Sequence, residues 1–214
     1  MNTLLTGFGP FRDVVNNPTE RLVRHFAKHG VPGHSLTTCV LPVAYVRAPA
    51  LLIEVIERGD AEGCAFDLIW MLGVASASVN WRVERYGRNE NAAAPDADDY
   101  WPPSRIDPAG PQILESSVPV DLLVSALSQA GLPAVPSESA GAYLCNHALY
   151  TALRHLQRTG RSIPAGFLHV PADSDTLLPG EAACAHFTFP QHIRAVQITL
   201  AALTSPSLSF RRPS

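Results

Sequence analysis

Short apolar segments alternate along this 214-residue chain with longer segments whose apolar residues recur every three or four positions. An apolar run such as 67–73 predicts a buried parallel strand, and the longer segments predict helices that bury one face. Strands that alternate with helices need crossover connections, which produce a mostly parallel sheet. The order therefore predicts an α/β fold in three layers, an open, twisted, mostly parallel sheet with helices on both faces.

The length suits one hydrophobic core, so we expect residues 1–214 to form a single domain. Residues 89–118 interrupt the alternation, because they are rich in Ala, Pro and Asp, and a loop of this length is expected to be a mobile lid. Residues 205–214 are expected to form a frayed tail. Strands are expected at 3–8, 35–43, 67–73, 81–88, 134–138 and 165–170, and helices at about 18–29, 47–58, 120–130, 140–158 and 190–203.

Composition excludes several classes of protein. The chain is 46% apolar and 16% charged, which is typical of a folded protein and not of a disordered one. Its net charge of −3 and its lack of a Lys/Arg cluster argue against nucleic-acid binding. It has neither an apolar run of the ~18 residues that span a membrane nor the basic start of a signal peptide. Its four cysteines are far apart, which argues against zinc and disulfides and favours a cytoplasmic protein with reduced thiols.

Cys145 is the first candidate for chemistry. Small residues at 139–142 lead into a predicted helix, and Cys145 lies in its early turns. The positive end of the helix dipole would stabilise a thiolate there, and nearby main-chain N–H groups could face an oxyanion. The competing interpretation, which position alone favours, is a buried cysteine that packs as a small apolar residue.

His169 and Glu84 are the next candidates. His169 is near the C-terminal end of the strand expected at 165–170, where an α/β enzyme holds a general base, although a structural histidine fits equally well. Glu84 could hold an imidazole in one tautomer, but a solvated glutamate paired with a neighbouring arginine is the commoner case. Of the other histidines, His147 would point away from Cys145 on a helix, and His192 is expected on an exposed face or a helix end.

The turn after the first strand contains two aromatic residues, Phe8 and Phe11. They could wall a small apolar pocket, or they could pack in the core. The turn lacks the third glycine of a dinucleotide-binding fingerprint, and the chain has no P-loop pattern. We therefore expect no NAD- or ATP-dependent chemistry.

Four motifs occur in order along the chain. They are Leu5-Thr6-Gly7-Phe8-Gly9-Pro10-Phe11 followed by Asn17-Pro18, Glu84-Arg85 with Asn89, Ser139-Ala140-Gly141 through Cys145-Asn146-His147, and Ala165-Gly166-Phe167-Leu168-His169-Val170-Pro171. In this order and spacing they resemble the motifs of pyroglutamyl peptidase I, a family of cytosolic cysteine peptidases also called pyrrolidone-carboxylate peptidases. The resemblance runs from Leu4 to about Pro171.

The resemblance implies that Cys145 is the nucleophile, that His169 is the general base and acid, and that Glu84 orients His169. It also implies that the chain removes an N-terminal pyroglutamyl residue from peptides without a cofactor or metal. Further implications are an open α/β sandwich, a cytoplasmic location and a homo-oligomer, frequently a tetramer.

Pyroglutamate is an uncharged five-membered lactam, so its pocket should be small and apolar with a few hydrogen bonds directed at the amide. We expect Phe8, Phe11 and Tyr143 to wall this pocket and Asn17 to make a polar contact. Gly73 and Val74, at the end of the central strand, are expected to line it as well.

The chain departs from the family's pattern near this site. Val74 occupies a position where the family usually has Gln, and residues 91–96 replace a stretch that contains an arginine near the catalytic centre. Arg88 and Arg105 are the candidates to replace that arginine. Residues 172–175 replace the family's usual Tyr-Leu-Pro-Glu-Gln. Three other functions therefore stay open: an inactive homologue that acts as a binding protein, a phosphorylase-like transferase, and a metallo-amidase.

Overall fold

The structure is a computed structural model that describes residues 1–11, 14, 16–176 and 187–204. Its centre is a six-stranded sheet with the strand order β2-β1-β3-β8-β4-β7. All neighbouring strands are parallel except β4 and β8, which are antiparallel. The strands are β1 (Asn2–Phe8), β2 (Ser35–Leu41), β3 (Leu68–Val74), β4 (Trp81–Glu84), β7 (Ala134–Ser137) and β8 (Ala165–Val170).

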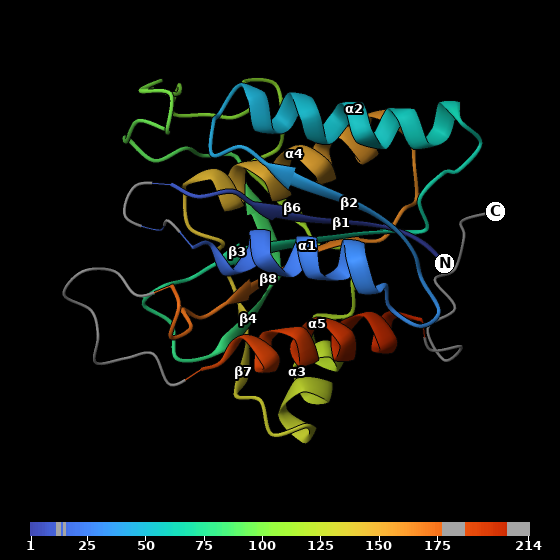
Figure 1. Cartoon of the computed structure of the whole chain (residues 1–214). Helices are drawn as coiled ribbons and strands as arrows, with labels where there is room; N and C mark the ends of the chain where they lie inside the picture. The colour runs from blue at the N-terminus through green and yellow to red at the C-terminus, as the bar shows by residue number, and fades with distance from the viewer. Residues whose placement is uncertain (12–13, 15, 177–186, 205–214) are drawn as a thin grey trace.

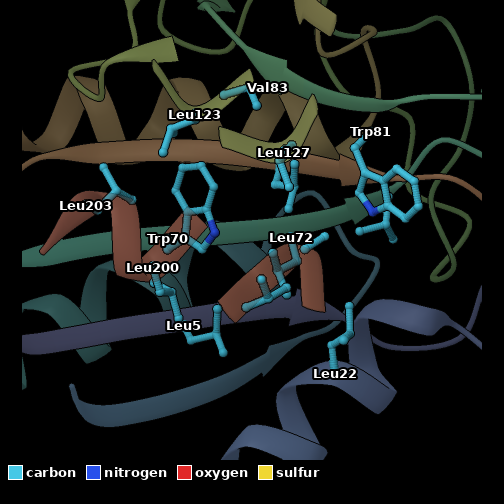
Figure 2. Packing of buried hydrophobic residues seen from close by; sticks show 14 of the residues in the cluster. Leu5, Leu22, Trp70, Leu72, Trp81, Val83, Leu123, Leu127, Leu200 and Leu203 are labelled. Carbon is cyan, nitrogen blue, oxygen red and sulfur yellow. The ribbon is translucent and has the colours of Figure 1, made fainter. Parts of the chain in front are cut away.

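Helices cover both faces of this sheet, which confirms the predicted three-layer α/β/α fold (Figure 1). One face carries α1 (Pro18–His29), α3 (Val120–Gln129) and α5 (Phe189–Leu203), and the other carries α2 (Arg47–Ala61) and α4 (Leu144–Thr159). Figure 2 shows the core on the first face, where the rings of Trp70 and Trp81 lie among leucines from the strands and helices. No helix in the described part of the chain is long and apolar enough to cross a bilayer.

Two predicted elements differ most from the observed ones, while the other predicted bounds differ by at most three residues. The strand expected at 81–88 is two strands, because the chain leaves the main sheet after Glu84 and β5 (Tyr86–Arg88) pairs antiparallel with β6 (Ile113–Glu115). The helix expected from 140 begins at Leu144, because Gly141 has a φ of 77° and interrupts a helical path. Both differences lie beside Cys145 and Glu84.

In the 89–118 segment, the buried side chain of Asn89, which is 1% exposed, forms hydrogen bonds to main-chain groups further along the segment. Its Nδ2 donates to the carbonyls of Asp107 and Gly110, and its Oδ1 accepts from the N–H groups of Ile106 and Asp107. Separation of residues 106–110 from Asn89 would therefore break these hydrogen bonds. That the segment is a mobile lid stays a prediction. The tail predicted at 205–214 lies outside the described residues.

The strand order decides which side chains meet. In the pairing of β3 with β8, Gly73 lies opposite His169. On the other side of β8, Arg82 of β4 lies opposite the same histidine. Side chains at paired positions point to one face of a sheet, and here that face is the one covered by α2 and α4. The beginning of α4 carries Cys145 on this face.

Candidate active site

Cys145 is the second residue of α4, one turn or less from the helix end where main-chain N–H groups have no partner within the helix. The N-cap residue is Tyr143, which is extended and makes no side-chain cap bond. Cys145 is half-buried and lies near the positive end of the helix dipole, beside the N–H groups of the first helical turn. The position therefore combines a thiolate-stabilising field with donors for an oxyanion.

Gly73 provides the room that the Cys145 sulfur occupies. A methyl group added to Gly73 would lie 2.8 Å from Cys145 Sγ and 2.7 Å from the ring of Phe167. Real Cβ atoms do not approach other atoms so closely. The glycine that ends the apolar part of β3 therefore lets α4 bring its thiol down onto the sheet.

His169 and Glu84, which are far apart in the sequence, form a buried pair. His169 Nδ1 lies 2.7 Å from Glu84 Oε1, and the two residues are 5% and 0% exposed. Burial by itself would lower the pKa of His169, but the charge and hydrogen bonding of Cys145 and Glu84 outweigh it and raise this pKa to about 9. Because Glu84 occupies Nδ1, the Nε2 atom remains for Cys145. Sulfur, imidazole and carboxylate thus form one connected group.

A small, mostly apolar pocket of about 20 Å³ adjoins Cys145. Five of the six residues predicted to bind substrate line it, and the sixth, Gly73, lies beneath the Cys145 sulfur instead. Val43 and Leu144 also line the pocket, and sequence reasoning missed both because an isolated apolar residue carries no signal of its own. The five predicted lining residues are Phe8, Phe11, Asn17, Val74 and Tyr143.

Asn17 has most of its hydrogen-bonding capacity committed within the protein. Its Oδ1 accepts from Thr19 N at 3.0 Å and Thr19 Oγ1 at 2.8 Å, which caps α1, and its Nδ2 donates to the Gly9 carbonyl at 2.9 Å. An amide nitrogen has two N–H donors, and only one of them has an acceptor among the described residues. Asn17 therefore joins the turn after β1 to the start of α1, and it offers the pocket a single donor.

Comparison with known proteins shows the family of this chain. The family model described as pyroglutamyl peptidase matches residues 1–205. The chain belongs to the pyroglutamyl peptidase family. Among curated relatives, the pyrrolidone-carboxylate peptidase of Halalkalibacterium halodurans is 33% identical over 189 residues, which is 87% of this chain and 89% of the relative. That of Oceanobacillus iheyensis is 37% identical over 170 residues, covering 79% and 83%.

Solved structures of this family have the same fold. The pyrrolidone carboxyl peptidase of Thermococcus litoralis superposes with a TM-score of 0.84 at 30% identity, covering 94% of this chain and 92% of that one. The pyroglutamyl peptidase I of Bacillus amyloliquefaciens superposes with a TM-score of 0.85 at 26% identity, covering 94% and 93%.

Neither arginine that sequence reasoning nominated to replace the family's arginine lines the pocket. Arg88 donates from Nε and Nη2 to the carbonyl of Glu138, and Arg105 donates to the carbonyl of Gly110. His192 lies in the first turn of α5, but it is not exposed there, because it is 0% exposed and packs against Trp81. His147 lies away from the thiol, with Nδ1 2.8 Å from Asn91 Oδ1. Nowhere in the described residues do three His, Cys, Asp or Glu side chains gather as a metal site.

Asn146 follows the thiol and connects the start of α4 to β5, and sequence reasoning did not single it out. It is 0% exposed, and its amide spans the edge of β5. Its Oδ1 accepts from Arg88 N at 2.8 Å, while its Nδ2 donates to the carbonyls of Arg88 and Glu90. The first turn of α4 is thereby fixed to the strand that follows Glu84. The available signal was an asparagine next to the candidate nucleophile in a predicted helix. If such a residue is buried, its amide needs hydrogen-bond partners in another segment.

Proposed function

We propose that the chain is a cysteine exopeptidase that hydrolyses the bond after an N-terminal pyroglutamyl residue, with Cys145, His169 and Glu84 as its catalytic group. The observation that carries the proposal is the buried 2.7 Å contact between His169 and Glu84, coupled to a thiol that opens onto a small apolar pocket. Family membership supports the reaction, and the substrates are peptides with an N-terminal pyroglutamate. The same resemblance supports a cytoplasmic location and a homotetramer.

The first half-reaction acylates the enzyme. His169 holds the proton of Cys145, and the thiolate attacks the pyroglutamyl carbonyl carbon, whose oxygen becomes an oxyanion facing the N–H groups at the start of α4. The tetrahedral intermediate collapses as the C–N bond breaks, and His169 gives its proton to the leaving amine. The products of this half are a thioester on Cys145 and a shortened peptide with a new N-terminal amine.

The second half-reaction releases pyroglutamate. His169, now neutral, takes a proton from water, and the hydroxide adds to the thioester carbonyl. The C–S bond breaks, and the thiolate–imidazolium pair returns. Through both halves Glu84 accepts a hydrogen bond from Nδ1, which holds the ring in one tautomer and stabilises its charged form.

The pocket accounts for selection of an uncharged ring. An ordinary N-terminal residue carries an ammonium group, and burying this charge against Phe8, Phe11 and Val74 without a partner is costly. The pyroglutamyl lactam has no such charge, and its carbonyl can accept the remaining N–H of Asn17. Glutaminyl and prolyl peptides should therefore be poor substrates.

We expect the protein to release a fluorescent amine from a pyroglutamyl amide in the presence of a reducing agent. Hydrolysis should be lost after treatment with iodoacetamide and should persist in EDTA, because the thiol and not a metal performs the attack. Lack of turnover by the reduced protein, with retained binding of pyroglutamate, would favour the inactive binding protein. A requirement for phosphate would favour the transferase, and loss of activity in EDTA would favour the metallo-amidase.

Glu84→Gln should lower kcat/KM about 10²- to 10³-fold without unfolding the protein, because an amide keeps the size of the carboxylate but cannot hold the imidazolium. Glu84 raises the pKa of His169, so its neutralisation should move the alkaline limb of the pH–rate profile to lower pH. Glu138→Gln is the matched control, since this carboxylate is 66% exposed and pairs with Arg85. Loss of less than threefold in the Glu84 variant would contradict the role.

A further inference from the structure

Arg82 lies beside the proposed catalytic group and has no part in the mechanism above. It precedes Glu84 by two residues on β4, so both side chains point to the same face of the sheet. In the antiparallel pairing of β4 with β8, Arg82 is directly opposite His169. Its Nε is 3.5 Å from Glu84 Oε1, the same oxygen that His169 contacts at 2.7 Å. One carboxylate oxygen therefore faces two cationic groups.

The far side of the Arg82 guanidinium is held by the segment that leads to the nucleophile. Its Nη2 donates to Ser137 Oγ at 2.6 Å and to the Ser139 carbonyl at 2.9 Å. Ser137 ends β7, and Ser139 opens the nucleophile motif that reaches Cys145. Three contacts thus hold the guanidinium in place although its side chain is 35% exposed. A guanidinium held on both sides is unlike a surface arginine that swings freely in solvent.

We infer that Arg82 is a positioning residue that shares the Glu84 carboxylate with His169 and thereby limits how tightly His169 holds its proton. A cation near the carboxylate offsets part of the negative charge that stabilises the imidazolium, and a cation opposite the ring repels it. The consequence matters for turnover, because His169 must give its proton to the leaving amine, and an acid that holds its proton too tightly is a poor donor. Arg82 acts through the Glu84 carboxylate and through the repulsion between its charge and the imidazolium.

Among the residues that the structure describes, few other charged groups face His169. Cys145 faces it from α4 and Glu84 faces it from β4. Arg82 lies opposite it in the pairing of β4 with β8. The adjacent strand β3 has no titratable side chain. In the nearby 137–139 segment, Glu138 is 66% exposed and pairs with Arg85. Removal of the Arg82 charge should therefore change how tightly His169 holds its proton.

The test compares Arg82→Met with Arg82→Lys. Methionine keeps the length of the side chain and removes its charge, whereas lysine keeps the charge and loses the fork of donors. We expect Arg82→Met to move the alkaline limb of the kcat/KM profile upward by about half to one pH unit, a size that allows for solvent screening. Arg82→Lys should leave that limb within about 0.2 pH unit of the parent protein. A purely structural role would change the height of both profiles and would leave the limb in place.

A second readout needs no substrate. The rate at which iodoacetamide alkylates Cys145, followed on the Cys145 peptide by mass spectrometry, changes as His169 loses its proton, and its alkaline transition should move with the kcat/KM limb. If Arg82→Met does not fold, Arg82→Gln replaces it as the uncharged variant. The inference is overturned if the pH of the alkaline transition increases by less than about 0.3 unit in the uncharged variant. It is also overturned if this pH increases equally in Arg82→Lys.

This inference rests on the proposed function, and the two can fail separately. If the parent protein does not hydrolyse a pyroglutamyl amide, the proposed function fails, while the alkylation profiles still test the influence of Arg82 on His169. If hydrolysis occurs and the profiles of the parent protein and Arg82→Met coincide, only the role of Arg82 fails.

Discussion

Cys145→Ala is expected to reduce kcat/KM for a pyroglutamyl amide by about 10⁵-fold or more, to the limit of detection. Alanine leaves no group that can form the thioester, so neither half of the reaction can proceed through the enzyme. The sulfur is partly exposed at the start of α4 and borders the pocket, so its loss should change the free energy of unfolding little. The measurement is release of a fluorescent amine at enzyme concentrations high enough to detect a residual rate.

The matched control for this prediction is Cys39→Ala. Cys39 is also a partly buried free thiol, but it lies on β2, and burial raises its pKa. It should therefore react slowly with iodoacetamide, and its removal should leave kcat/KM unchanged. Turnover by Cys145→Ala within about 100-fold of the parent protein would contradict the assignment of the nucleophile. Equal losses in the two variants would indicate damage to the fold instead.

Local signals predicted the elements whose bounds depend on local chemistry. Residues 18–29 form a helix because Asn17 caps it, Pro18 can begin it and Gly30 ends it with a φ of 67°. The strand at 165–170 follows from a run of small and apolar residues that only His169 interrupts. The strand at 81–88 was predicted as one element because its residues do not show where the chain leaves the sheet. That break depends on residues 113–115, which pair with β5 and are distant in the sequence.

The candidate site was predictable in the same uneven way. The ends of strands and the start of α4 indicated where Cys145 and His169 would lie, because ligands of open α/β sheets bind at such ends. The contact of His169 with Glu84 joins residues 85 positions apart, and spacing within one strand cannot predict it. Arg82 was invisible for a similar reason. Its proposed role depends on lying opposite His169 and reaching Ser139, and both contacts require the register of β4 with its neighbours.

Gly73→Ala is expected to lower stability through one contact and activity through another. The added methyl group would lie 2.7 Å from the Phe167 ring and 2.8 Å from Cys145 Sγ, so at least one of them must move. Overpacking of this kind typically costs about 1–3 kcal/mol in the free energy of unfolding. A sulfur displaced by about 1 Å from its line of attack lowers kcat/KM by about 10². Thermal unfolding and amide hydrolysis, measured on the same samples, give the two quantities.

Gly9→Ala is the matched control, because its nearest atoms would be 3.8 Å from the new methyl group although Gly9 also lies beside the pocket. It should keep most of its activity and stability. In the double variant Gly73→Ala, Phe167→Leu, the smaller side chain relieves the contact with the ring and leaves the contact with the sulfur. Stability should then recover in part while activity stays low, because the thiol is still displaced. Full recovery of activity in the double variant would mean that the ring, and not the sulfur, is what Gly73 accommodates.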